Sequence, residues 1–201
     1  MAKYPEYPFP KLIADFRADY QRSGGAARPL PLMLAKATVC PGLKAISYYR
    51  LSHYLWCRGL LLPAKLLHSR MVKTTGADIQ PAARIGPGCW LPHPVGVVVG
   101  MGVEVGAACT IYQSATLGES LSPIDGHSYP RLGNRVLICS GAVVVGPITV
   151  GDDVVVGANS FLRQSVDSGC LVAGAPARIL RRPPSPDPAG LPSTARESGI
   201  S

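Results

Sequence analysis

Residues 132–162 read LGNRVLICSGAVVVGPITVGDDVVVGANSFL, and an aliphatic residue stands at every sixth position of this stretch. The same spacing starts at Ile79 and is interrupted twice, by two extra residues before Val99 and by a longer insertion between Leu117 and Leu132. A fixed period of this kind defines an internal repeat. The aliphatic guide positions are Ile79, Ile85, Leu91, Val99, Val105, Ile111, Leu117, Leu132, Ile138, Val144, Val150, Val156 and Leu162.

The six-residue period predicts a parallel β-helix. In such a fold each hexad supplies one short strand and one turn, three hexads complete a triangular coil, and the guide residue points inward. Glycine at the corners permits the positive φ angles that the turns need. A β-sandwich of short strands is the alternative, but the turns of a sandwich are not evenly spaced. We therefore expect a mainly β protein.

A helical pattern precedes the repeats. Apolar periodicity predicts an amphipathic helix over Pro10–Arg22 and further helices over Leu43–Arg58 and Pro63–Lys73. Gly24-Gly25 and Pro41-Gly42 are predicted breaks before the second helix, and Gly76 is the predicted end of the third.

These patterns divide the chain into three regions. The expected regions are an N-terminal α-helical segment over residues 1–75, a hexapeptide-repeat domain over residues 76–182 and a tail over residues 183–201. The tail is rich in Pro, Ser and Gly and is predicted to be disordered.

Composition limits the classes of function. The chain is 47% hydrophobic and 16% charged, which is typical of a globular protein. Its net charge of +8 comes from scattered basic residues, so nucleic-acid binding is not expected. The six cysteines form no CxxC pair, which favours reduced thiols in the cytoplasm over disulfides or a metal site. No signal peptide or membrane-spanning stretch is recognised, and we expect a soluble cytoplasmic protein.

The four histidines are the main candidates for chemistry. His53 and His68 lie in the helical region and are expected to be packing or surface residues. His127 lies in the longer insertion, which is either a functional loop or a solvated one. His93 follows Asp78 by fifteen residues, close to one eighteen-residue coil, so the two are expected near each other on consecutive coils. Asp78 either orients the His93 imidazole for general-base catalysis or caps the junction between helix and repeats.

Three runs of sequence resemble bacterial serine O-acetyltransferases. They are DIQPAARIGPGCWLPHPVGVVVGMGVEVGAACTIYQSATLG from Asp78, GAVVVGPITVGDDVVVGANSFL from Gly141 and VAGAPARIL from Val172. The resemblance covers about residues 76–182 and implies a left-handed parallel β-helix that uses acetyl-CoA as co-substrate. It also implies that His93, paired with Asp78, deprotonates an acceptor hydroxyl, which then attacks the thioester directly.

The same resemblance implies a homotrimer with its active sites between subunits. Coenzyme A is then expected in a groove between adjacent solenoids, and no metal is expected. The matching positions for cofactor binding are Gly118, Ser140, Val155 and Ala158, with Arg178, Arg181 and Arg182 placed to meet phosphates. Cys139 and Ser140 stand where the family commonly has Gly and Ala.

The residues expected to bind the acceptor differ from those of the family. Pro92 precedes His93 where the family usually has Asp, and Ser128-Tyr129-Pro130 replaces an Arg-His-Pro whose Arg meets the substrate carboxylate. His127, Tyr129 and Arg131 remain as candidate acceptor ligands. The chain ends in Gly-Ile-Ser, whereas the family tail that docks into cysteine synthase ends in Ile, which argues against that partnership.

The expected function is acetyl-CoA-dependent O-acetylation of serine or a related small hydroxy amino acid. Two alternatives stay open from the sequence. One is O-acetylation of a sugar or polysaccharide hydroxyl, which the changed acceptor side favours. The other is a non-catalytic solenoid that acts as an assembly partner, which the presence of both Asp78 and His93 disfavours.

Overall fold

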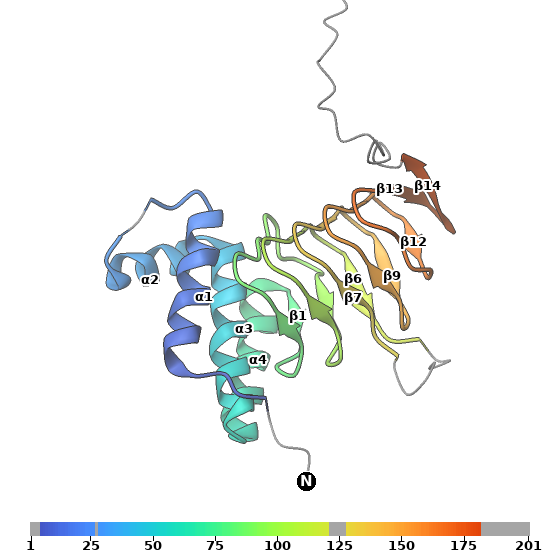
Figure 1. Cartoon of the computed structure of the whole chain (residues 1–201). Helices are drawn as coiled ribbons and strands as arrows, with labels where there is room; N and C mark the ends of the chain where they lie inside the picture. The colour runs from blue at the N-terminus through green and yellow to red at the C-terminus, as the bar shows by residue number, and fades with distance from the viewer. Residues whose placement is uncertain (1–4, 27, 121–127, 182–201) are drawn as a thin grey trace, which may run out of the picture.

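The computed structural model describes residues 5–26, 28–120 and 128–181. Within these ranges four helices precede fourteen short strands (Figure 1). The helices are α1 (Phe9–Arg22), α2 (Leu30–Val39), α3 (Pro41–Cys57) and α4 (Leu61–Thr75). No helix in the described ranges has both the length and the apolarity needed to cross a bilayer. The predicted disordered tail lies outside the described residues.

The strands are two to five residues long and run from residue 78 to residue 181. They are β1 (Asp78–Ile79), β2 (Arg84–Ile85), β3 (Val98–Val99), β4 (Glu104–Val105), β5 (Thr110–Ile111), β6 (Thr116–Gly118), β7 (Arg131–Leu132), β8 (Leu137–Ile138), β9 (Val143–Val145), β10 (Thr149–Val150), β11 (Val155–Val156), β12 (Phe161–Leu162), β13 (Leu171–Gly174) and β14 (Ala177–Arg181).

Three sheets run along the axis of the coil. Sheet A has the order β1-β3-β6-β9-β12, sheet B the order β10-β7-β4-β2, and sheet C the order β14-β13-β11-β8-β5. All pairings are parallel except that of β13 with β14. Val98 pairs with Thr116 and Val143 with Phe161, each eighteen residues further on, as three hexads per coil require. The predicted parallel β-helix is confirmed.

The guide residues form the core of this coil. Each of the thirteen aliphatic guide positions is buried, with at most 6% of its surface exposed. Burial of one such side chain contributes about 1.5–3 kcal/mol relative to leaving it in water. The stack of aliphatic rungs therefore stabilises the repeat domain along its whole length.

The corners depend less on glycine than the sequence suggested. Five non-glycine residues have φ between 54° and 60°: Ala108, Ser114, Arg135, Asp153 and Asn159. Asn and Asp tolerate this left-handed region because their short polar side chains bond locally, whereas a residue such as Ala pays a steric cost. Stacking between coils thus imposes the corner geometry on residues that do not prefer it.

Three of the helices match the predicted ones, and α2 was missed. Its sequence LPLMLAKATV is apolar on most sides, so it lacks the alternation of faces that marks a helix in sequence. Pro41 and Gly42 are not a break but the start of α3, where proline suits the first helical position. Gly42 also packs so closely on the backbone of Leu91 that a Cβ would collide with it. Gly76 ends α4 with a φ of 72°, as predicted.

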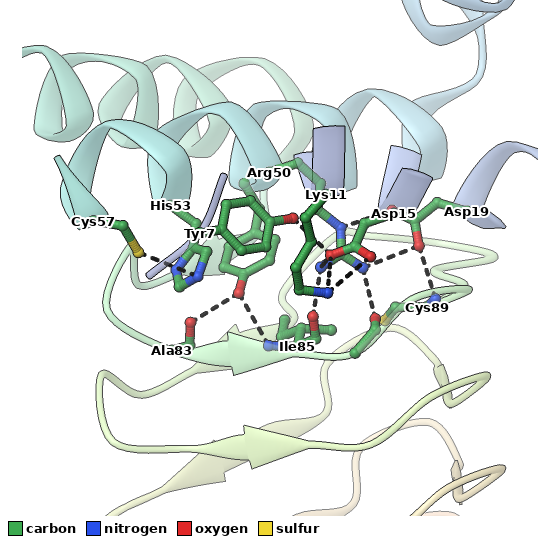
Figure 2. A network of polar contacts seen from close by, with 12 residues as sticks. Tyr7, Lys11, Asp15, Asp19, Arg50, His53, Cys57, Ala83, Ile85 and Cys89 are labelled. Atoms are coloured by element: carbon green, nitrogen blue, oxygen red, sulfur yellow. Dashed lines mark hydrogen bonds and ion pairs between the residues drawn. The ribbon is translucent and has the colours of Figure 1, made fainter. Parts of the chain in front are cut away.

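The helices lie at the N-terminal end of the coil, opposite β13 and β14 (Figure 1). A buried polar network joins them to the first coil (Figure 2). Arg50 of α3, 1% exposed, donates from Nε to Oδ2 of Asp19 at 2.8 Å and from its other nitrogens to the carbonyls of Ile85 and Gly86. Oδ1 of Asp19 also accepts a bond from the backbone N–H of Cys89 at 2.9 Å. The ion pair therefore satisfies polar groups of the coil that would otherwise be buried without partners.

Two aromatic rings of the same region add contacts to the first coil. The Tyr49 hydroxyl donates to the carbonyl of Ala83 at 2.8 Å and accepts from the N–H of Ile85 at 3.1 Å. Nδ1 of His53 lies 2.8 Å from the carbonyl of Pro81 and donates to it. His53 is thus a packing residue, as the sequence suggested, and burial lowers the pKa of its ring.

We expect Arg50→Met to destabilise the protein by about 3–5 kcal/mol, because it leaves the buried Asp19 carboxylate without its cationic partner and removes the side-chain donor of two carbonyls. The matched control is Arg84→Met. Arg84 is 64% exposed and pairs with Glu104 at 3.1 Å, and exposed pairs contribute about 0–1 kcal/mol. Urea unfolding at fixed protein concentration, followed by far-ultraviolet circular dichroism, measures both. Equal losses in the two variants would contradict the role given to Arg50.

We expect acidification to destabilise the fold through His53. Its pKa is lowered in the folded state, so the unfolded chain takes up the proton first, and the free energy of unfolding falls as the pH drops below about 6.5. Thermal unfolding between about pH 7.5 and pH 5.5 measures the effect. His53→Asn keeps a donor near the Nδ1 position but does not titrate. The pH dependence should be weaker in this variant, and an unchanged dependence would rule out His53 as its source.

Candidate active site

His93 lies on one edge of the triangular coil. It sits between Trp90, which bridges to Thr110 of sheet C, and β3 of sheet A, and it belongs to the corner that carries the two-residue insertion. We call the line of corners between sheets C and A the C/A edge. The His93 side chain is exposed, and within the described ranges its ring makes no hydrogen bond or ion pair. The ring is therefore accessible to a reactant.

Two predicted cofactor positions, Ser140 and Ala158, share this edge with His93. The N–H of Gly141 bonds to the carbonyl of Gln113, and the N–H of Asn159 bonds to the carbonyl of Ser140, at 3.0 and 2.9 Å. These bonds stack the corners of successive coils, with Ser140 and Ala158 at equivalent places. The sequence prediction missed Gln113, whose buried Oε1 has no partner in the described part of the chain.

Asp78 lies in β1, the first strand of sheet A, and pairs with Val98 of β3. The N–H of Gly96 bonds to the carbonyl of Gly76 at 2.9 Å, so the corner after His93 stacks on the turn before Asp78. The two residues therefore lie on consecutive coils, as the spacing predicted. Their side chains, however, are not hydrogen-bonded to each other in the described structure.

The carboxylate of Asp78 binds a different histidine. Its Oδ1 lies 2.8 Å from Nε2 of His68 in α4 and accepts a bond from Nε2 of Gln80 at 3.0 Å. The sequence prediction missed both donors. A signal was available for His68, since the helix that carries it ends at Gly76, two residues before Asp78.

The remaining cofactor candidates are spread along the coil. Gly118 ends β6 in sheet A, and Val155 begins β11 in sheet C. Arg178 and Arg181 are exposed on β14 at the C-terminal end of the coil. Arg182 lies outside the described residues.

The acceptor candidates lie on another edge. The longer insertion connects β6 of sheet A to β7 of sheet B, and we call that line of corners the A/B edge. The ring of Tyr129 packs on the backbone of Gly100 and Gly102 one coil below. Burial raises the pKa of Tyr129, and its hydrogen bond to Glu119 raises it further. Arg131 is exposed, 3.8 Å from a carboxylate oxygen of Glu104, and His127 lies outside the described residues. A single chain thus keeps Tyr129 and Arg131 on a different edge from His93.

The described residues hold no group of three or more side chains suited to a metal ion. The six cysteines are all free thiols. Burial raises the pKa of Cys139, next to Ser140, so this thiol stays protonated at neutral pH and is not an activated nucleophile. Within the described part of the chain, His93 on the C/A edge is the accessible base best placed beside the predicted cofactor positions.

Known proteins share this sequence and this fold. The family described as bacterial transferase hexapeptide (six repeats) matches residues 129–164. A serine acetyltransferase of Synechococcus elongatus is 37% identical over 87% of this chain and 69% of its own length, and one of Mycobacterium tuberculosis is 38% identical over 86% and 73%. A solved serine acetyltransferase in complex with CoA superposes with a TM-score of 0.73 at 32% identity, covering 86% of this chain and 71% of that one.

The likeness therefore extends over most of the chain, in fold as well as in sequence. It extends into the N-terminal helices, since the matched share exceeds the repeat domain alone. The left-handed parallel β-helix implied by the sequence is confirmed. The protein belongs to the serine acetyltransferase family of hexapeptide-repeat acyltransferases.

Proposed function

We propose that the chain transfers an acetyl group from acetyl-CoA to the hydroxyl of serine. The observation that carries this proposal is its identity of 37–38% to serine acetyltransferases over most of its length. The exposed His93, at the position where the sequence resemblance implies the catalytic base, adds support. A related solved structure holds CoA, which supports acetyl-CoA as co-substrate. The two alternatives, a sugar acetyltransferase and a non-catalytic solenoid, are not favoured by these relatives.

His93 is the proposed general base. Its ring takes the proton of the serine hydroxyl as the hydroxyl oxygen attacks the thioester carbonyl. Backbone N–H groups stabilise the oxyanion of the tetrahedral intermediate. When the C–S bond breaks, the imidazolium returns the proton to the CoA thiolate. Asp78, on the preceding coil, is the proposed partner that orients the ring.

We propose a homotrimer in which the helical segment (1–75) and the repeat domain (76–182) act together. The support is that Tyr129 and Arg131 lie on the A/B edge whereas His93 lies on the C/A edge, so contact between them requires a second chain. The acetyl-CoA groove then runs between two neighbouring coils and includes the C/A edge of one of them. The proposed lining residues are Gly118, Ser140, Val155, Ala158, Arg178, Arg181 and Arg182.

The acceptor is proposed to bind where the two edges of neighbouring chains meet. A serine zwitterion needs a cationic partner for its carboxylate. Arg131 supplies an exposed guanidinium, while His127 and Tyr129 supply further polar contacts. We place the protein in the cytoplasm, since all six of its thiols are free and three of them are buried.

We expect His93→Ala to lower kcat by roughly 10²–10⁴-fold, because general-base catalysis typically contributes that much. Release of the CoA thiol from acetyl-CoA in the presence of L-serine measures the rate. His93 is exposed and makes no bond in the described structure, so the variant should unfold at the wild-type temperature and sediment like the wild type. A variant that keeps activity within about tenfold of wild type would remove the assignment.

We expect serine to support faster thiol release than homoserine, other amino acids, hexoses or oligosaccharides. For the sugars, the physical reason is that a neutral hydroxyl compound has no carboxylate to pair with the Arg131 guanidinium. Release with sugars alone would identify a sugar acetyltransferase. No release with any acceptor would support the non-catalytic solenoid.

A further inference from the structure

Two donors from different elements share one oxygen of Asp78. Nε2 of His68, from α4, lies 2.8 Å from Oδ1, and Nε2 of Gln80, from the turn after β1, lies 3.0 Å from the same atom. A carboxylate only accepts, so Nε2 of His68 carries the proton in this contact. Oδ2 has no hydrogen bond within the described ranges. The carboxylate is thus held on one side and open on the other.

The Asp78 carboxylate needs donors to fix its orientation because its side chain is partly open to solvent. The His68 ring lines a cavity of about 350 Å³, and the Asp78 side chain itself is 44% exposed. The other lining residues are Trp56, Lys65, Gln80, Pro81, Ala82 and Met101. A cavity of this size, lined in part by the polar side chains of Lys65, His68 and Gln80, has room for water. Without the His68 donor, Gln80 would be the remaining side-chain donor to the carboxylate within the described ranges, and the carboxylate could turn to bond solvent instead of a catalytic partner.

The hydrogen bond is not needed to attach α4 to the coil. The chain runs directly from the end of α4 through Gly76 into β1, and α4 packs chiefly on α3. A partly exposed pair of this kind contributes little to folding stability. The main effect of this hydrogen bond is therefore on the orientation of the Asp78 carboxylate.

We propose that His68 is a positioning residue for catalysis: it fixes the Asp78 carboxylate through Oδ1, so that Oδ2 is presented to the His93 imidazole. This inference rests on the proposed function, in which Asp78 orients His93. The helical segment then takes part in acetyl transfer through α4. Gln80 assists by donating to the same oxygen.

A pair of amide substitutions tests the role of His68. In His68→Gln the side-chain N–H reaches the position of Nε2, whereas in His68→Asn the amide is too short and ends near the position of Nδ1. We expect His68→Asn to lower kcat with serine about tenfold, since small displacements of catalytic groups have effects of that order or larger. His68→Gln should retain most of the activity. The KM for acetyl-CoA should stay unchanged in both variants.

A double-mutant cycle with Asp78→Asn separates positioning from a general structural effect. If His68 acts through Asp78, adding His68→Asn to Asp78→Asn causes no further loss of kcat. If His68 instead has a general structural role, the two reductions in kcat multiply in the double variant. The matched control is Ser69→Ala, an exposed neighbour on α4, which should behave like the wild type.

The outcomes distinguish this inference from the proposed function. Full activity in both His93→Ala and Asp78→Asn would overturn the proposed function itself. A loss in Asp78→Asn with no loss in His68→Asn, or with independent losses in the cycle, would overturn only the role of His68. If His68→Asn unfolds at a lower temperature than Ser69→Ala, His68→Leu replaces it in the comparison with His68→Gln. The kcat of each variant is then expressed per folded protein.

Discussion

The buried ion pair between Arg50 and Asp19 closes the N-terminal end of the coil. A parallel β-helix exposes backbone donors and acceptors at its first rung, and such an end needs a cap. Arg50 satisfies the carbonyls of Ile85 and Gly86, while Asp19 accepts from the N–H of Cys89. Neither charge is tolerable alone in an apolar interior. The helices and the repeats consequently stabilise each other.

This cap also sets the position of the site. Because α3 is fixed on the first coil, α4 packs beside it and ends at Gly76, directly before the strand that carries Asp78. His68 then meets the Asp78 carboxylate. The next coil begins with the corner of His93, which stacks on the turn at Gly76. The candidate catalytic residues thus occupy the first two rungs, where coil and helices meet.

The insertion between β6 and β7 lies on a different edge of the prism from His93. A rigid triangular coil cannot bend to bring its edges together, because the guide residues fill its interior. Functional contact between the edges therefore requires a neighbouring chain. The proposed acceptor ligands at this edge, Tyr129 and Arg131, would then act on the active site of a partner rather than on their own.

The sequence alone determined the fold. Each guide residue had to be aliphatic because it faces a dry interior, so a six-residue period was visible without any structure. The expectation that Asp78 and His93 lie on consecutive coils followed from the length of a coil. The sequence did not reveal α2, whose apolar residues show no preferred face, nor the bond between His68 and Asp78. That bond joins a helix to a strand, and only the packing of α4 against the coil decides which donor reaches the carboxylate. The period of the sequence indicates which residues are buried. The direction of a polar side chain depends instead on neighbouring residues that only the tertiary structure brings close.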